Sequence, residues 1–270
     1  MLNLSVMIAL LWTSSLAAPR FTSLQVVPGQ PLMWRPATHV ASRQAETCLP
    51  IPDERYGTLP LPEWEPAQWP AEHHADVNLA LRGYTPTHDF LGLMEIAGGG
   101  DDLQAPQLAS LFARPHVPTF VALYRVYNWN WDCNCRGEPI DDPTVTLAEL
   151  AVLPDETIHV PRSGYEIGGG YQALVLYASE ERLTLKYTAE DNVVVGYTLH
   201  LENICVEPNL LALYRASDSA GRHSLPALRA GQAVGRARSN GIGVAIRDTG
   251  AFMDLRAHQD WWRTVDGSSP

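Results

Sequence analysis

Positive charge is scarce in this sequence of 270 residues. Its 19 lysines and arginines stand against 30 aspartates and glutamates, so the formal net charge at pH 7 is −11. A field of this sign repels phosphate groups, which argues against a nucleic acid or an anionic membrane as a partner. Long apolar runs are lacking as well, and beyond the N-terminal residues we expect no transmembrane segment.

The common catalytic motifs are also missing. The sequence has neither a Gly-x-Ser-x-Gly nucleophile elbow nor a His-Glu-x-x-His zinc motif. The glycines at 98–100 have no phosphate-loop lysine and no strong helix after them, so we interpret them as a turn. A glycosidase with two carboxylates far apart in the sequence stays open, because such a pair leaves no local motif.

Residues 1–17 have the pattern of a signal peptide. The apolar run at 4–16 is too short to span a bilayer, and small residues at 15 and 17 stand where a signal peptidase cleaves. No lysine or arginine precedes the run, and a core helix is the alternative interpretation. We expect an exported protein, either secreted or held in the cell envelope.

Cysteine is sparse, with only four residues: Cys48, Cys133, Cys135 and Cys205. An even number in an exported chain predicts two disulfides. A direct bond between Cys133 and Cys135 would close a very small ring, so we predict that these two bond instead to Cys48 and Cys205. A zinc cluster is the alternative for Cys-Asn-Cys, although a structural zinc site needs a second such pair.

Residues 18–70 are predicted to form an extended strap, because prolines recur every few residues from 28 to 70 and exclude regular helix and sheet. We interpret Trp34, Trp64 and Trp69 as apolar anchors that pack the strap against the rest of the chain. Stacking of these rings on a glycan or wall polymer is the alternative.

The remaining sequence reads as short β-strands. In the β-rich region 71–165 we expect strands at 76–81, 90–96, 119–131, 145–150 and 157–160, with a short helix at 105–112. The signal strengthens from residue 171, with strands at 173–177, 182–188, 193–205, 210–214 and 242–246. The 182–188 strand alternates strictly, which is typical of a half-exposed strand. Glycines and turn residues at 231, 235 and 248–250 predict tight hairpins. We therefore predict a mainly β protein with a small barrel or sandwich at its C-terminal end.

Two groups of side chains are candidate sites. His74 and Asp76 would point the same way on the 76–81 strand, with His73 beside them, which is an arrangement that a divalent metal could use; an exposed strand end is the alternative. The second group is an aromatic row on the 119–131 strand. Buried, the row would be core, and exposed, it would stack against sugar rings. The row consists of Tyr124, Tyr127, Trp129 and Trp131.

The stretch from Tyr197 to Asp254 resembles the lysostaphin-type, LytM-like zinc endopeptidases. It has a tyrosine and His200 ahead of a leucine, then a Gly231-Gln232 turn with Gly235, then a terminal strand and a glycine turn. The resemblance implies an antiparallel barrel-sandwich domain over residues 166–265. It also implies that His200 is the histidine that assists catalysis.

The resemblance ends at the zinc ligands. The family's terminal strand carries two histidines one residue apart, whereas this sequence reads GVAIRD at 243–248. The family's first histidine and aspartate stand four apart, unlike His74 and Asp76. Without a full ligand set zinc cannot generate a nucleophile, so we expect no cofactor and place His200 on the open face of a strand.

These observations predict an exported, non-catalytic cell-envelope module. It would bind peptidoglycan, another glycan or an envelope protein. The alternatives are a zinc-dependent cell-wall hydrolase that uses His74, Asp76 and His200, and a purely structural surface protein.

Overall fold

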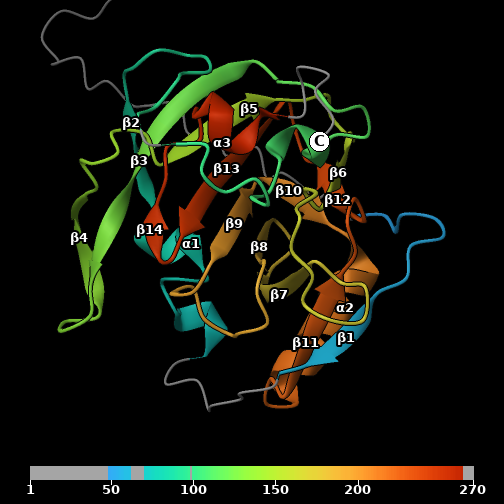
Figure 1. The fold of residues 1–270 in the computed structure, drawn as a ribbon. Coiled ribbons are helices and arrows are strands. Elements are labelled where there is room, and N and C mark those ends of the chain that lie inside the picture. The colour runs from blue at the N-terminus through green and yellow to red at the C-terminus, as the bar shows by residue number, and fades with distance from the viewer. Residues whose placement is uncertain (1–47, 62–69, 98, 264–270) are drawn as a thin grey trace, which may run out of the picture. The chain divides into compact units, whose positions relative to one another are not determined.

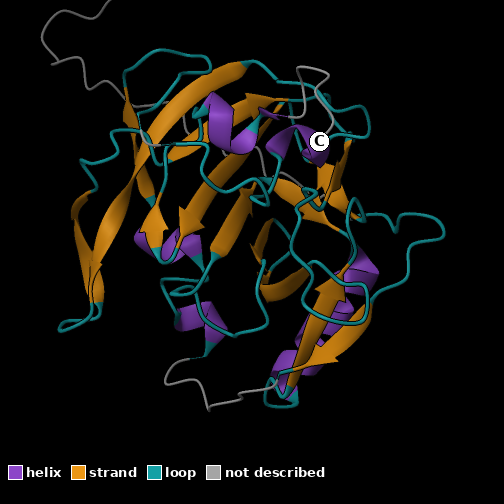
Figure 2. Cartoon of the chain, viewed as in Figure 1, coloured by secondary structure: helices purple, strands orange, loops and turns teal. Residues whose placement is uncertain are grey.

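The structure of the protein is a computed structural model that describes residues 48–61, 70–97 and 99–263. Figures 1 and 2 show a mainly β chain whose strands pair antiparallel, which confirms the predicted fold class. The predicted signal peptide and Trp34, Trp64 and Trp69 lie outside the described residues. Part of the predicted strap is seen at Gly57–Pro60, where it is a strand.

One large sheet contains eleven of the described strands. Its hydrogen-bonded order is β1-β11-β7-β8-β9-β13-β5-β3-β2, with β14 paired to β13 and β4 paired to β3. The strands are β1 Gly57–Pro60, β2 Tyr84–Thr87, β3 Phe120–Asn130, β4 Cys135–Pro139, β5 Leu147–Ala151, β7 Ala173–Ala178, β8 Arg182–Lys186, β9 Tyr197–Glu202, β11 Ser224–Leu228, β13 Gly241–Asp248 and β14 Ala251–Phe252. Within the described chain the end strands β1 and β2 do not pair with each other, so the sheet does not close into a barrel.

A second, three-stranded sheet has the order β10-β12-β6. Its strands are β10 Ile204–Val206, β12 Ala233–Ala237 and β6 Thr157–His159. The helices are short, namely η1 Ala71–His73, α1 Leu79–Arg82, η2 Leu108–Leu111, α2 Pro208–Ser219 and α3 His258–Trp261. None of the helices in the described ranges is long and apolar enough to cross a membrane.

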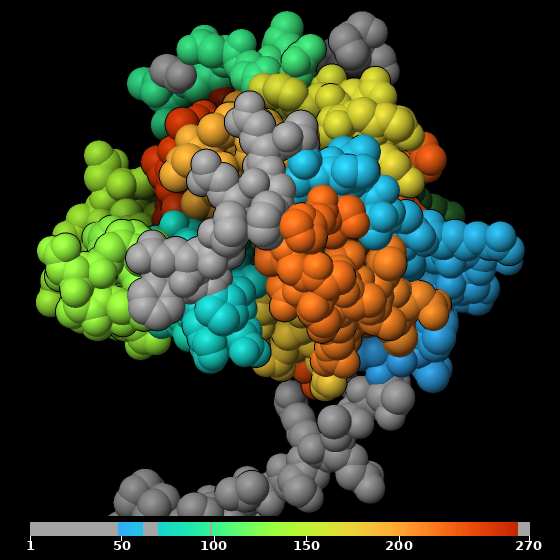
Figure 3. Space-filling view, turned by 90° about the horizontal axis from the view of Figure 1, so that it is seen from below, coloured from blue at the N-terminus to red at the C-terminus, as the bar shows by residue number. Residues whose placement is uncertain are grey.

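The predicted regions 71–165 and 166–265 contribute to the same large sheet. β5 pairs with β13, and β1 pairs with β11 in register from Gly57 opposite Ala227. In Figure 3 the blue atoms around β1 lie against the orange atoms of β11 and α2. The expected boundary at residue 165 therefore falls inside one sheet.

Two predicted strands are in fact helical. The 210–214 segment belongs to α2, because Glu207 caps the helix by accepting a hydrogen bond from the Leu210 amide and Pro208 fits its first turn. The 76–81 segment runs into α1 at Leu79–Arg82, which Asn78 caps and Gly83 ends at a φ of 65°. In both segments a polar cap decided between helix and strand.

The 90–96 segment is also not a strand. The β pairing of this segment is an isolated bridge between Met94 and Ala257. The expected helix at 105–112 is shorter than predicted and corresponds to the 3-10 helix η2.

The main apolar core lies on one face of the large sheet, and two smaller apolar clusters pack apart from it. Alternate residues of β8, β9 and β13 point into the main core, and they include Leu185, Leu199 and Ile246. These side chains are fully buried. The period of two along each strand places these apolar residues on the same face.

The disulfides join Cys48 to Cys205 and Cys133 to Cys135, so the predicted pairing is wrong. Cys133 and Cys135 occupy the tip of the β3–β4 hairpin. There Asn134 has a φ of 48°, and the turn brings the two cysteine Cα atoms to 5.3 Å. The tight turn keeps these cysteines close together, and Cys48 is left to pair with Cys205 on β10.

Candidate functional site

The face of the sheet opposite the core carries polar side chains in ordered rows. Because β8, β9 and β13 pair in register, Lys186, Thr198 and Arg247 form one row, and His200 lies beside Thr184 in the next. Glu202 and Arg182 form a third row. We call this surface the polar face. The predicted half exposure of the 182–188 strand is wrong, since Leu183 through Lys186 are all buried.

Residues 70–83, the cover segment, bury the middle of the polar face. Thr184 Oγ1 donates a hydrogen bond of 2.6 Å to the carbonyl oxygen of Val77. Arg247 on β13 donates from Nη1 to Asp76 Oδ1 at 3.0 Å, and Arg82 donates from Nη2 to the same oxygen at 2.6 Å. These bonds tie a segment without strand pairing to the centre of the sheet.

Asp76 lies between two guanidinium groups and is largely buried. Burial alone would raise its pKa, but Arg247 and Arg82 outweigh burial and hold the pKa of Asp76 below its usual range. The arginines in turn lie over the Phe252 ring, with guanidinium carbons 4.7 Å and 5.7 Å from its centroid. Asp76 thus forms ion pairs that hold the cover segment on the sheet.

His200 is almost completely buried, at 1% exposure, so its predicted place on an open strand face is wrong. Thr184 Oγ1 donates to Val77, so its 3.1 Å contact with His200 Nδ1 requires the imidazole to donate. The ring stacks on Phe252 at 6.1 Å. Burial, with help from Arg247 and Arg82, lowers the pKa of His200 to about 3.

His74 belongs to the cover segment and contacts the β3–β4 hairpin through Trp131. Its Nδ1 accepts a hydrogen bond of 3.2 Å from the Asp76 amide, and its ring lies 5.1 Å from that of Trp131. Burial lowers the pKa of His74. His73 is exposed and pairs with Glu72.

The residues expected to bind zinc do not fit the ion. Asp76 is occupied by two arginines, and His74 uses a ring nitrogen on the backbone. Arg82 and Arg247 would also repel a cation near His200. No group of three or more metal-ligating side chains occurs within the described ranges.

The aromatic row predicted on β3 is divided in the structure. Tyr124 packs edge-on against Tyr84 with ring centroids 5.1 Å apart, and Tyr127 lies under the Arg136 guanidinium. Trp129 and Trp131 contact each other at 6.4 Å near the hairpin tip. Trp131 is 45% exposed, so the row as a whole is not buried core.

A pocket opens on the polar face where the cover segment ends. Its volume is about 290 Å³, near the lower end for ligand pockets. Tyr84 and Tyr124 form one wall, and the Tyr124 hydroxyl donates to Glu149 Oε2 at 3.1 Å. We call it the acidic pocket; its lining is Tyr84, Tyr124, Leu147, Glu149, Glu181, Arg182, Glu202, Asn203, Gly241 and Gly243.

Two glycines of β13 make room for the carboxylates. Gly243 pairs with Glu149 on one side and with Glu202 on the other, so the two acids flank it. A Cβ atom on Gly243 would lie 3.0 Å from the Glu202 Cβ, and one on Gly241 would collide with the Glu149 carboxylate. The glycine at every second position therefore keeps the pocket floor open.

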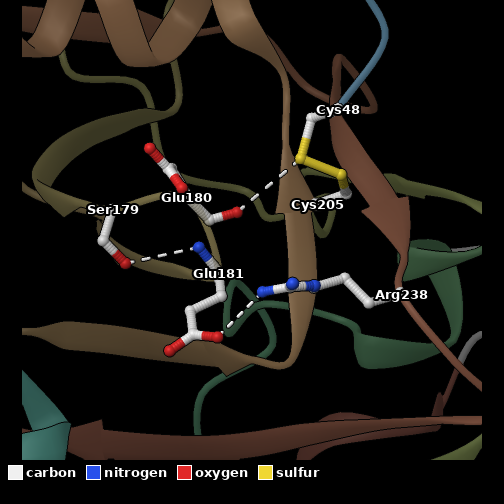
Figure 4. Close-up of a disulfide and its surroundings, with 6 residues drawn as sticks. All are labelled: Cys48, Ser179, Glu180, Glu181, Cys205 and Arg238. Atoms are coloured by element: carbon white, nitrogen blue, oxygen red, sulfur yellow. Dashed lines mark hydrogen bonds and ion pairs between the residues drawn. A yellow bond between two sulfur atoms is a disulfide. The ribbon is translucent and has the colours of Figure 1, made fainter. Parts of the chain in front are cut away.

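The acids on one side of the pocket are paired with arginines. Arg182 donates from Nε to Glu202 at 2.8 Å and from Nη1 to Glu181 at 2.6 Å. Figure 4 shows the Glu181 carboxylate directed toward Arg238, which donates at 2.8 Å, close to the Cys48–Cys205 bond. Burial raises the pKa of Glu202 to about 7, although Arg182 opposes the shift.

Sequence reasoning missed Glu149, Glu202 and Tyr84. The signal that could have found them is the pair Gly241 and Gly243, because glycine on one face of a strand marks room for neighbouring side chains. Which residues fill that room depends on the pairing of β5, β9 and β13.

Comparison with known proteins adds no assignment. No family model matches the sequence, and no curated protein matches it well enough to be a relative.

Proposed function

We propose that the protein is an exported, non-catalytic module that binds a glycan of the cell envelope in the acidic pocket. The observation that carries this proposal is the composition of the pocket, in which two tyrosine rings adjoin hydrogen-bonding carboxylates and an arginine. Aromatic faces pack on the apolar faces of sugar rings, and fixed acceptors and donors bind hydroxyl groups.

Export and the LytM-like resemblance belong to the same proposal. Asp76 accepts hydrogen bonds from arginines, and His200 is hydrogen-bonded to Thr184 beneath the cover segment. Because zinc would need these same groups as ligands, their contacts support binding over zinc-dependent hydrolysis.

Calorimetric titration with soluble peptidoglycan fragments and chitin-derived oligosaccharides tests this proposal. Tyr84→Ala removes an exposed ring from the pocket wall and should weaken binding about tenfold, as expected for the loss of one aromatic contact. Trp131→Ala, on the distant hairpin, is the matched variant and should leave affinity unchanged. Loss of binding in Trp131→Ala alone would move the site to the hairpin, and no binding by the wild type would refute the proposal.

A second candidate is a glycosidase, and the placement of Glu149 and Glu202 on either side of Gly243 favours it. Their Cα atoms are two strand spacings apart, roughly 10 Å. In such an enzyme one carboxylic acid protonates the leaving oxygen, and the other carboxylate activates water or attacks the sugar. Release of reducing ends from oligosaccharides, lost in both Glu149→Gln and Glu202→Gln, would select this candidate over binding alone.

A further inference from the structure

The carboxylates of the acidic pocket differ in how their charge is balanced. Glu181 pairs with Arg182 and Arg238, and Glu202 pairs with Arg182. Glu149 forms no ion pair with any described residue, and its side-chain partner is the neutral hydroxyl of Tyr124. The pocket therefore contains one carboxylate whose charge the surrounding protein leaves uncompensated.

Glu202 adds an unused acceptor. Its side chain is only 4% exposed, and Oε2 accepts the hydrogen bond from Arg182. Within the described chain Oε1 accepts no hydrogen bond, although the residue lines the pocket. Oε1 is not among the enclosed side-chain atoms that lack a partner, so it is accessible from the pocket and can accept a hydrogen bond from a ligand.

The pocket offers few free donors of its own. Asn203 already donates to Ser239 and to the Gly241 carbonyl, and Arg182 uses Nε and Nη1 on two glutamates, which leaves its Nη2. The tyrosine rings present negative π faces, which attract a cation. These features select a ligand that brings hydrogen-bond donors and positive charge.

We propose that the acidic pocket recognises an amino sugar with a free, unacetylated ammonium group. The ammonium would lie beside Glu149 and donate to its carboxylate, with the sugar ring against Tyr84 and Tyr124. This assignment rests on the proposed glycan-binding function and names its ligand class. An N-acetyl group removes the charge and adds bulk in a pocket of about 290 Å³, so acetylated sugars bind less well.

The test compares a glucosamine tetramer with its fully N-acetylated counterpart by calorimetric titration at pH 6, where the amine is protonated. A charge-assisted hydrogen bond in a buried pocket predicts that the amine form binds about ten- to a hundredfold more tightly. Glu149→Gln should remove this preference, whereas Glu138→Gln, an exposed position on β4, should retain it. Thermal melting of both variants checks that they fold.

Each other outcome overturns the assignment in a distinguishable way. Equal binding of both tetramers, unchanged in Glu149→Gln, would refute the amino sugar and leave the glycan proposal standing. Absence of binding by either tetramer and by peptidoglycan fragments would refute both. A trilysine peptide that binds as tightly as the amine tetramer would show recognition of a cationic peptide instead.

Discussion

His200 illustrates how the setting of one residue changes its role. A histidine on an open strand would contribute only a local hydrogen bond, yet here the ring is enclosed by Phe252, Thr184 and the cover segment. We predict that His200→Ala lowers the free energy of unfolding by about 2 to 4 kcal/mol, from the cavity and the lost hydrogen bond. Urea denaturation measures this change. A loss below 0.5 kcal/mol, like that expected for exposed His88→Ala, would contradict the burial.

Two buried groups predict opposite dependences of stability on pH. The pKa of His200 falls from 6.5 to about 3 on folding, so the unfolded chain binds more protons between these values and stability rises with pH. The pKa of Glu202 rises from 4.5 to about 7, so the folded chain binds more protons there and stability falls with pH.

The two effects oppose each other from about pH 4.5 to 6.5 and can be separated by substitution. His200→Gln removes one of two histidines that oppose the Glu202 effect, since the pKa of His74 is also lowered, so the free energy of unfolding should rise less or fall more across this window than in the wild type. In Glu202→Gln it should rise. Denaturation curves at several pH values measure both slopes, and unchanged slopes in both variants would contradict these pKa shifts.

At the scale of elements, the cover segment is held mainly by Asp76. Asp76→Ala leaves Arg82 and Arg247 buried without their counter-charge, which should cost about 3 to 5 kcal/mol. Hydrogen exchange should then accelerate across residues 74–83 before the sheet opens. Asp132→Ala, at the exposed hairpin tip, is the control. Matching exchange in both variants would show that the ion pairs do not hold the cover.

Sequence patterns predict the strands of the sheet better than the cover segment that packs on them. The strands at 182–188, 193–205 and 242–246 contain β8, β9 and most of β13, because one face of each is wholly apolar. A similar alternation in residues 76–81 was misleading. Asn78 caps a helix there and Gly83 ends it, so this segment forms a short helix over the sheet. The Glu149 and Glu202 pair was out of reach, because it depends on register between strands about 50 residues apart.

At the scale of the whole molecule, the two disulfides differ in the length of chain that they close. Cys48–Cys205 spans 157 residues and Cys133–Cys135 spans 2. Chain-entropy arguments give about 5 kcal/mol for the long loop and about 1.5 kcal/mol for the short one. The double serine variant at Cys48 and Cys205 should therefore lose more stability in urea denaturation. An equal or reversed order, or non-reducing peptide maps that show other pairs, would contradict this account.

Binding of a glycan in the acidic pocket is the central claim, and a crystal structure with the tightest-binding oligosaccharide tests it most directly. We expect one sugar ring against Tyr84 and Tyr124, with hydrogen bonds to Glu149 and Glu202. A sugar bound instead at Trp129 and Trp131, or a pocket that stays empty at saturating oligosaccharide, would contradict the claim.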